Sequence, residues 1–353
     1  MHNKVFNTFI ELCSIASPSG KEERVRAYIL NRFKKLHLEV FVDTVGNIYT
    51  SKKGTGKPLL LCAHLDTVLP ATNQTPVIRE GVVYSDGTSV LGADDKSSVA
   101  AILEAVEEIV TSGKNHRSFE ILFTVREETD GGLRSFPREK IMSQSALIAD
   151  IGLPVGTIVT AAPFVTGYSI TVGAPGSHVG RFTNKTVHPL SFLTSFIQAL
   201  PFGRLRDDVI TNIAMVKMGE SYNSVPQSLY FTGELRTHDA AYHKTFVKTL
   251  SSIVPNLDKK LKTESKLELF PYCTGYILSK NEITETEKIL SEQSLPVRKE
   301  TVFSVGDFNI LHEWGIIPVN IGNGAMDVHT THEHIAVESL SQLQTIFRNH
   351  LIQ

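Results

Sequence analysis

Apolar residues in the first half of the chain follow two spacings, which predict that helices and strands alternate. Apolar positions every three or four residues predict amphipathic helices over residues 5–16, 22–36 and 97–110. Short uninterrupted apolar runs predict buried strands over residues 59–63, 119–125 and 146–149. Residues 40–42 and 46–49 predict a hairpin. Because strands alternate with helices, we expect an α/β domain with a mostly parallel sheet sandwiched by helices.

The pattern changes after about residue 162, and it predicts a separate α+β insert. Strands are expected over residues 167–172, 212–218, 228–236 and 266–270, with helices over 187–200 and 240–253. This order of elements predicts a split βαβ, or ferredoxin-like, domain. The α/β pattern then resumes with helices over 282–293 and 338–349 and a strand over 317–321. We therefore expect a catalytic domain in two parts, 1–164 and 273–353, and an inserted lid or dimerisation domain over 165–272.

Composition narrows the class of protein further. A length of 353 residues favours more than one domain. The 35 basic and 37 acidic residues nearly balance, which argues against a nucleic acid or anionic membrane partner. Cys13, Cys62 and Cys273 lie far apart in the sequence, as is typical of reduced thiols in a reducing compartment. No apolar stretch is long enough to span a bilayer, and the first residues lack the features of a signal peptide. We expect a soluble, cytoplasmic protein.

Polar side chains follow each of the three predicted buried strands. His64 follows the first strand, Glu127 and Glu128 follow the second, and Asp150 follows the third. Asp94 directly precedes the helix over 97–110, where the helix dipole favours negative charge. Taken singly, each of these residues could be a turn, a cap or a solvated charge. Because the carboxyl ends of parallel strands meet at one edge of a sheet, we expect these side chains to converge.

The converging groups have the composition of a two-metal site. With His329 from a polar segment near the C-terminus, they provide two imidazoles and three ligand carboxylates, one of which would be shared. Oxygen and nitrogen donors without thiolate suit Zn²⁺, Co²⁺ or Mn²⁺. One carboxylate of the Glu127–Glu128 pair remains as a general base for a metal-bound water, which indicates hydrolysis of an amide or ester. Asp66 shares a strand face with His64 and could orient its imidazole.

At these residues the chain resembles the co-catalytic zinc exopeptidases and deacylases, a family that includes peptidase T, carboxypeptidase G and acetylornithine deacetylase. The segments that carry the resemblance are AHLDTV, GADDKSSVAAILEA, FTVREETDGG, ALIAD and HTTHEHIAVESL. Together with SPSGKEE near the start and the predicted insert, they span essentially the whole chain. The segment YSDGTSVLGADDKSS is most similar to the peptidase T branch.

The resemblance implies a role for each matching residue. His64 and Asp150 would bind one metal, Glu128 and His329 the other, and Asp94 would bridge both, with a peptide bond after it that is often cis in the family. Glu127 would be the general base, and Asp66 would orient His64. In the insert, His178 would stabilise the oxyanion of the tetrahedral intermediate, and Arg236 and Asn223 would contact substrate. Two divalent ions are implied as cofactors, Zn²⁺ first, with Co²⁺ or Mn²⁺ as alternatives.

Several alternatives remain open at this point. An aminopeptidase on tripeptides or other short peptides is the leading interpretation. A deacylase or carboxypeptidase on N-acyl amino acids or dipeptides would use the same metals and base. A catalytically inactive peptide-binding relative is the non-enzymatic alternative. Relatives often dimerise through the inserted domain, so a homodimer is open too, and with it whether His178 serves its own site or the partner's. The segments 218–220 and 305–309 depart from the family pattern, so they leave the peptide specificity open.

Overall fold

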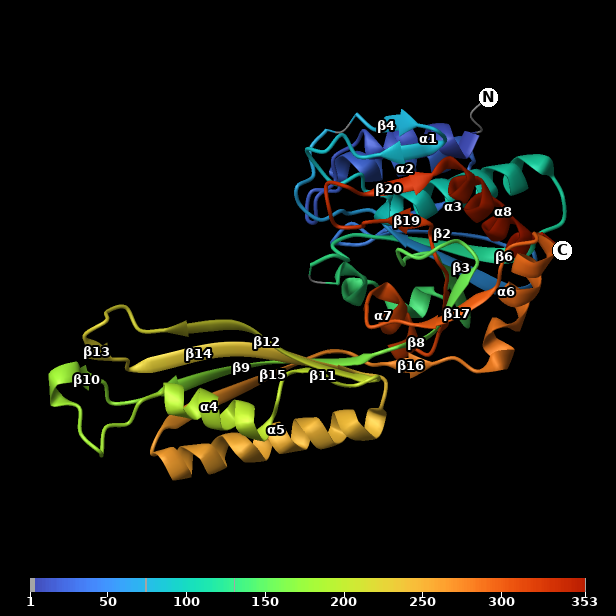
Figure 1. The fold of residues 1–353 in the computed structure, drawn as a ribbon. Helices are drawn as coiled ribbons and strands as arrows, with labels where there is room; N and C mark the ends of the chain where they lie inside the picture. Colours follow the sequence, from blue (N-terminus) through green and yellow to red (C-terminus); the bar gives the residue numbers. More distant parts are fainter. Residues whose placement is uncertain (1–3, 74, 130, 353) are drawn as a thin grey trace. The chain divides into compact units, whose positions relative to one another are not determined.

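The computed structural model describes residues 4–73, 75–129 and 131–352 and divides the chain into two compact units. Unit 1 comprises residues 1–160 and 278–353, and unit 2 comprises residues 161–277 (Figure 1). Each unit has its own sheets and helices, which are described separately below.

The main sheet of unit 1 has six strands in the order β1-β2-β6-β3-β7-β18. Four neighbouring strands, β6 (Arg117–Thr124), β3 (Thr55–His64), β7 (Ser145–Ile148) and the edge strand β18 (Ile317–Asn320), pair in parallel. β1 (Val40–Val42) and β2 (Ile48–Lys52) form the predicted hairpin at one edge, antiparallel to β6. Leu60, Leu61, Cys62 and Phe123 are fully buried, as expected for strands covered on both faces. The mostly parallel sheet expected from the sequence is confirmed.

The helices of unit 1 pack on this sheet and on one another. They are α1 (Lys4–Cys13), α2 (Glu23–Lys35), α3 (Ala93–Ser112), α6 (Lys280–Glu292), α7 (Asp307–Glu313) and α8 (Val337–Leu351), with short 3₁₀ turns η1 (Gly132–Ser135) and η2 (Arg138–Lys140). α3 contacts α1, α8 and β3, and its residues 93–106 are buried on every side. A helix that is buried on every side lies at the centre of a domain. The start of α3 is therefore held rigidly against the sheet.

A smaller sheet of unit 1 joins the N-terminal and C-terminal parts of the chain. It has the order β19-β20-β5-β4 and comprises β4 (Val77–Arg79), β5 (Val82–Tyr84), β19 (Ala325–Met326) and β20 (His334–Ala336). The loop between β19 and β20 carries His329. Sequence analysis did not predict these strands, because each is only two or three residues long and offers no measurable alternation.

Unit 2 has the ferredoxin-like topology that the sequence predicted. Its five-stranded sheet has the order β11-β12-β14-β9-β15, with every neighbouring pair antiparallel. The strands are β9 (Phe164–Gly173), β11 (Gly203–Arg206), β12 (Val209–Met218), β14 (Ser228–Thr237) and β15 (Glu264–Cys273). The helices α4 (Leu190–Ala199) and α5 (Ala240–Leu261) follow β9 and β14. β12, β14, β9 and β15 give the order expected of two interleaved βαβ units, and β11 adds an edge strand.

The remaining short strands form two further small sheets. β8 (Thr157–Ala162), β16 (Tyr276–Ile277) and β17 (Arg298–Thr301) form a three-stranded sheet in the order β16-β8-β17. β10 (Ser177–His178), the 3₁₀ turn η3 (Val179–Arg181) and β13 (Ser224–Val225) belong to unit 2, and β10 pairs with β13. Across the described residues, none of the helices combines the length and apolar character needed to traverse a bilayer.

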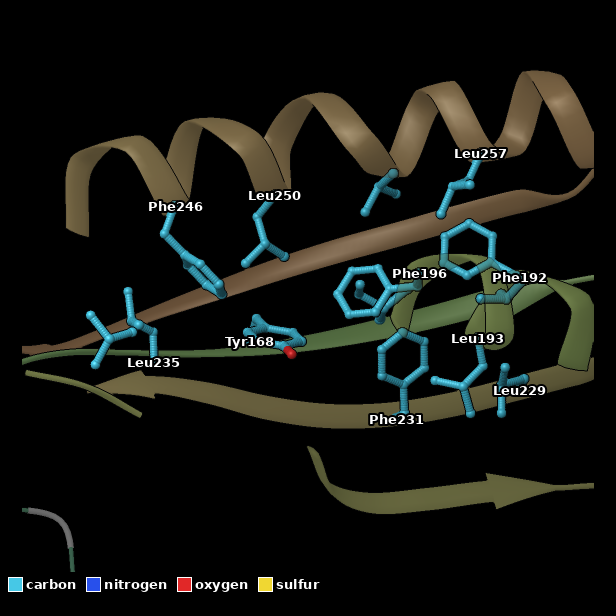
Figure 2. Packing of buried hydrophobic residues seen from close by; sticks show 14 residues of the cluster. Tyr168, Phe192, Leu193, Phe196, Leu229, Phe231, Leu235, Phe246, Leu250 and Leu257 are labelled. Carbon is cyan, nitrogen blue, oxygen red and sulfur yellow. The ribbon is translucent and has the colours of Figure 1, made fainter. Parts of the chain in front are cut away.

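The core of unit 2 forms where α4 and α5 cover one face of the sheet (Figure 2). Phe246, Leu250 and Leu257 project from one side of α5 at helical spacing. Phe192 and Phe196 of α4 lie four residues apart and stack on each other. On β14, Phe231 faces the same layer and meets Phe196 edge to face, with ring centroids 5.1 Å apart. The aromatic residues give unit 2 a core separate from that of unit 1.

Candidate metal centre

The predicted ligands of unit 1 come together at the carboxyl ends of the parallel strands. His64 is the last residue of β3, Glu127 and Glu128 follow β6, and Asp150 follows β7. Asp94 lies at the start of α3, where Asp94 and Asp95 depart from helical backbone angles and the peptide bond between them is cis. The preceding Gly92 has φ +73°, and a Cβ there would lie 2.9 Å from the Thr67 methyl carbon. Only glycine fits this turn without strain.

His64 is buried and is oriented by the backbone that follows its strand. Its Nδ1 lies 2.9 Å from the carbonyl oxygen of Asp66 and 3.6 Å from the Asp66 Oδ1 atom. A carbonyl oxygen only accepts hydrogen bonds, so Nδ1 carries a proton and Nε2 faces the cluster. Nε2 lies 3.6 Å from Asp94 Oδ1 and 3.7 Å from Asp150 Oδ1. The orienting contact thus comes mainly from the Asp66 carbonyl, whereas sequence analysis had assigned it to the carboxylate.

The Asp94 carboxylate lies between the two imidazoles. Its Oδ1 faces His64, and its Oδ2 lies 3.3 Å from Nε2 of His329. The same His329 nitrogen lies 2.8 Å from Glu128 Oε1. His329 itself adopts a left-handed backbone with φ 64°, which is uncommon for a residue with a side chain and is typical of functional sites. One carboxylate flanked by two imidazoles is the arrangement expected of a ligand shared by two metal ions.

Asp66 ties the segment after β6 to the end of β3. Its Oδ1 accepts the backbone N–H of Glu127 at 3.0 Å, and its Oδ2 accepts that of Glu128 at 3.2 Å. The hydroxyl of Ser19 donates to the same Oδ2 at 2.6 Å. Burial acts to raise the pKa of Asp66, but His64 and these donors hold it below its usual value. The carboxylate is therefore ionised and fixes the backbone on which both glutamates are carried.

Glu127 points toward Asp150 beside a glycine that has no space for a side chain. A Cβ on Gly306 would lie 2.7 Å from Glu127 Oε1 and 3.3 Å from Asp150 Oδ2. Burial, followed by the charge of Asp150, raises the pKa of Glu127 well above its usual value. Burial, followed by the charge of Asp94, does the same to the pKa of Asp150. In the absence of cations these carboxylates therefore repel one another and retain protons.

The cluster fits divalent cations. Within the described part of the chain, Asp94 Oδ1 and both carboxylate oxygens of Asp95 are buried and accept no hydrogen bond. Donor atoms of His64, Asp94 and Glu128 lie within 4.8 Å of one another, and so do those of His64, Asp95 and Asp150. Buried acceptors without donors are costly unless a cation satisfies them. An oxygen and nitrogen donor set of this kind suits Zn²⁺, Co²⁺ or Mn²⁺, and these residues could hold two such ions.

Sequence analysis missed two buried carboxylates beside the cluster. Glu333 is 1% exposed and accepts the backbone N–H groups of Gly92 at 2.7 Å and Asp94 at 3.0 Å. Burial raises the pKa of Glu333 to about 7. Glu333 thus links the loop that carries His329 to the turn that carries Asp94. Its place in the segment HTTHEH is the available signal, but only His329 of that segment is assigned a role from the sequence.

Asp307, the second of these carboxylates, lies at the start of α7. It accepts a hydrogen bond from the Thr124 hydroxyl at 2.6 Å, at the end of β6. Burial raises the pKa of Asp307 to about 6. Nothing in the local sequence marks Asp307 as buried, since an acidic residue in the first turn of a helix is usually a solvated charge. The hydrogen bond to its carboxylate comes from Thr124, a residue 183 positions earlier in the chain.

The three predicted site residues outside this cluster all lie in unit 2. His178 belongs to β10, and its exposed ring accepts the Gly180 N–H through Nδ1 at 3.1 Å. Asn223 lies beside it, since the Val179 N–H donates to the Asn223 carbonyl at 2.9 Å. Arg236 is near the other end of β14 and pairs with Glu234 at 2.9 Å. The structure brings His178 and Asn223 together, and Arg236 is separated from them by about 25 Å of extended strand.

The fold and the site together define a class. A parallel α/β sheet whose strand ends converge on two histidines and a group of carboxylates, with a ferredoxin-like domain inserted, is the architecture of a metal-dependent exopeptidase. The chain belongs to the peptidase family M20/M25/M40, whose family model matches residues 60–353. It is therefore a hydrolase of the peptidase class, and the resemblance to the peptidase T branch is confirmed.

Three individual relatives are similar over nearly the full length. The chain is 24% identical over 350 residues to the uncharacterized protein YqjE of Bacillus subtilis, which covers 96% of this chain and 94% of the relative. It superimposes with a TM-score of 0.93 on the aminopeptidase PepT of Bacillus cereus, at 24% identity, over 99% of this chain and 98% of the other. A tripeptidase of Staphylococcus aureus gives a TM-score of 0.93 at 26% identity, over 99% and 98% of the two chains.

Proposed function

We propose that this chain is a metal-dependent aminopeptidase that removes the N-terminal residue from tripeptides and other short peptides. The observation that carries the proposal is the Asp94 carboxylate, held 3.6 Å from His64 and 3.3 Å from His329 with Glu127 and Glu128 beside it. The similarity to an aminopeptidase PepT and to a tripeptidase supports the choice of substrate. We place the enzyme in the cytoplasm, in keeping with its buried free cysteines.

Each residue of the cluster has a distinct part in this proposal. His64 and Asp150 would hold one ion, His329 and Glu128 would hold the other, and Asp94 would serve both. Two bound divalent ions, Zn²⁺ by preference or Co²⁺ or Mn²⁺, would lower the pKa of water and polarise the scissile carbonyl. Glu127 accepts the proton of the attacking water and then donates it to the leaving amine. Asp66 fixes the backbone of both glutamates, which keeps the base within reach of the water.

The residues of unit 2 have the roles that the family resemblance gives them. His178 donates to the oxyanion of the tetrahedral intermediate, and Asn223 and Arg236 contact the peptide. Whether His178 acts in its own chain or in the partner of a homodimer is decided by the assembly.

A deacylase on N-acyl amino acids is the second candidate, since the same ligands and base would serve it. The two activities differ in whether a free amine is present at the N-terminus of the substrate. An inactive peptide-binding relative is disfavoured, because every proposed ligand and the proposed base are present and converge in one cluster.

The variant Glu127→Gln tests the assignment of the base. We expect it to keep both metal ions and lose at least about 1,000-fold in kcat, since general base catalysis is removed while the shape of the side chain is retained. Glu139→Gln, at an exposed glutamate of η2, is the matched control and should retain full activity. Metal content by elemental analysis and tripeptide hydrolysis are measured on the same samples. Near wild-type turnover by Glu127→Gln would show that another group is the base.

A further inference from the structure

Glu333 is a buried carboxylate to which the proposed function assigns no part. It lies on the loop between β19 and β20, four residues after His329. Residues 327–332 of this loop are exposed or half-buried, whereas Glu333 is 1% exposed. Burying a carboxylate is costly unless hydrogen bonds satisfy its oxygens. The burial of Glu333 is therefore explained by the contacts that its side chain makes.

Both oxygens of Glu333 accept hydrogen bonds from the turn at the start of α3. Oε2 accepts the backbone N–H of Gly92 at 2.7 Å, and Oε1 accepts that of Asp94 at 3.0 Å. The first N–H groups of a helix have no partner within the helix. Residues 92–95 are buried, so bulk water cannot replace these acceptors. The conformation of the turn that carries Asp94 thus depends on Glu333.

The backbone of Glu333 is held in place as well as its side chain. Its carbonyl accepts the N–H of Ser85 at 3.0 Å, and its own N–H donates to the Thr330 carbonyl at 3.2 Å. The next residue, His334, begins β20, which pairs with β5. The ring of His334 also stacks on Tyr84, with ring centroids 5.3 Å apart. Glu333 is therefore fixed at its own end, and its two hydrogen bonds fix the start of α3 relative to the loop.

We propose that Glu333 is a positioning residue for the second ion, defined as the ion that His329 and Glu128 would hold. The inference rests on the proposed function and adds that Glu333 sets the place of Asp94 relative to His329. In the structure, His329 Nε2 lies 3.3 Å from Asp94 Oδ2 and 2.8 Å from Glu128 Oε1. Glu333 maintains this arrangement because its backbone belongs to the His329 loop while its carboxylate binds the Asp94 turn.

Removing one acceptor of Glu333 should affect the two ions unequally. Glu333→Gln keeps the size of the side chain but replaces one acceptor oxygen with an NH₂ group. Loss of a group that orients a metal ligand typically lowers metal affinity by about 10- to 100-fold, and we expect a loss of this size for the second ion. The first ion should lose less, because the main sheet carries its ligands His64 and Asp150 and only Asp94 is disturbed.

Calorimetric titration of the metal-free chain with Co²⁺ measures the affinities of both binding steps. His329→Ala removes a ligand of the second ion only, so it identifies which step belongs to that ion. Glu120→Gln is the matched control, because Glu120 is 2% exposed in unit 1 and also accepts two backbone N–H groups, from Met142 at 2.8 Å and Ser143 at 2.7 Å. Both glutamine variants should lower the Tm of the metal-free chain, but only Glu333→Gln should lower the affinity for the second ion.

The possible outcomes separate this inference from the proposed function. Unchanged affinities in Glu333→Gln, equal losses for both ions, or the same loss in Glu120→Gln would overturn the positioning role and leave the two-metal site standing. If Glu333→Gln does not fold, Glu333→Asp, whose carboxylate is one methylene shorter, takes its place with the same expected result.

Failure of both Glu333 variants to fold, while Glu120→Gln folds, would overturn the inference because Glu333 would then serve the fold alone. A wild-type chain that binds both ions but cleaves no tripeptide would remove the proposed substrate and support the positioning role if Glu333→Gln still loses the second ion selectively. A wild-type chain that binds no Co²⁺ would overturn the proposed function and the inference together.

Discussion

Replacing Asp66 with asparagine should destabilise unit 1 and disturb the site at the same time. The Asp66 carboxylate is fully buried and accepts three hydrogen bonds, from the N–H groups of Glu127 and Glu128 and from the hydroxyl of Ser19. Asparagine keeps one oxygen and replaces the other with an NH₂ group, which cannot accept a hydrogen bond. At least one backbone N–H then loses its acceptor, and the remaining bonds are made to a neutral group.

The expected loss follows from the strength of these bonds. A hydrogen bond to a charged group contributes roughly 1.5–3 kcal/mol, and a buried donor left without an acceptor costs roughly 1–3 kcal/mol. We therefore expect the free energy of unfolding to fall by about 3 kcal/mol. For a unit of this size the melting temperature should fall by about 6–12 °C. Because Glu127 and Glu128 lose a fixed backbone, kcat should fall by about 100-fold as well.

The chain has a single tryptophan, Trp314, which lies in unit 1 and allows the unfolding of that unit to be followed by fluorescence. Asp86→Asn is the matched control. Asp86 also accepts an N–H and a hydroxyl, both from Thr88 at 2.9 and 2.6 Å, but it is exposed. Its replacement should change the free energy of unfolding by less than about 0.5 kcal/mol.

The dependence on pH provides a second check. The pKa of Asp66 is lowered in the folded chain, so its stabilising contribution is present above the pKa of the unfolded chain, about 4, and is lost as the pH falls through the folded value. The difference between the wild type and Asp66→Asn should therefore be full at neutral pH and shrink in acid. Equal stability of the two proteins at neutral pH would refute the claim that this carboxylate anchors the site.

Three further predictions concern the metals and the base. Asp94→Ala should reduce the metal content from two ions per chain to less than one, because it removes a ligand from both ions, and retention of two tightly bound ions would contradict the bridging role. Gly306→Ala should lower kcat by about 10-fold or more while leaving metal content unchanged. The new Cβ atom would lie 2.7 Å from Glu127 Oε1 and would displace that carboxylate. Full activity of this variant would show that Glu127 has room to move. Metal binding at neutral pH should release more than two protons per chain, because neighbouring carboxylates raise the pKa of His64 above its usual value despite burial and raise that of His329 to about 10. Both imidazoles and the carboxyl group of Asp150, whose pKa is raised as well, must lose a proton to bind metal. The affinity for divalent metal ions should therefore rise with pH. Titration calorimetry in two buffers of different ionisation enthalpy would measure the proton release. Metal binding without proton release would contradict this account.

Much of the fold and the cluster could be predicted because their signals are local. The apolar runs that become β3, β6 and β7 are each followed by a polar ligand, and the geometry of a parallel sheet then brings His64, Glu128 and Asp150 to one edge. Asp94 could be placed because it precedes a strongly periodic helix. The ferredoxin-like insert was predicted from its order of elements alone.

The remaining features depend on contacts between distant parts of the chain. Glu333 bonds to the backbone of Gly92 and Asp94, about 240 positions earlier, and no local pattern indicates such a contact. The anchoring of Glu127 and Glu128 by Asp66 is equally non-local, and the sequence suggested only the contact between Asp66 and its neighbour His64. The short strands β19 and β20, which carry the His329 loop, lack the length to produce a periodic signal.

The central claim is that two metal ions at the Asp94 cluster allow this chain to hydrolyse the N-terminal bond of short peptides. The most direct test measures metal content together with hydrolysis of a tripeptide and of its N-acetylated counterpart. We predict two divalent ions per chain, cleavage of the free-amine tripeptide and no cleavage of the acetylated one, with activity lost on chelation and restored by Zn²⁺, Co²⁺ or Mn²⁺. Cleavage of the acetylated peptide alone would change the activity to that of a deacylase, and a chain that binds no metal would contradict the account.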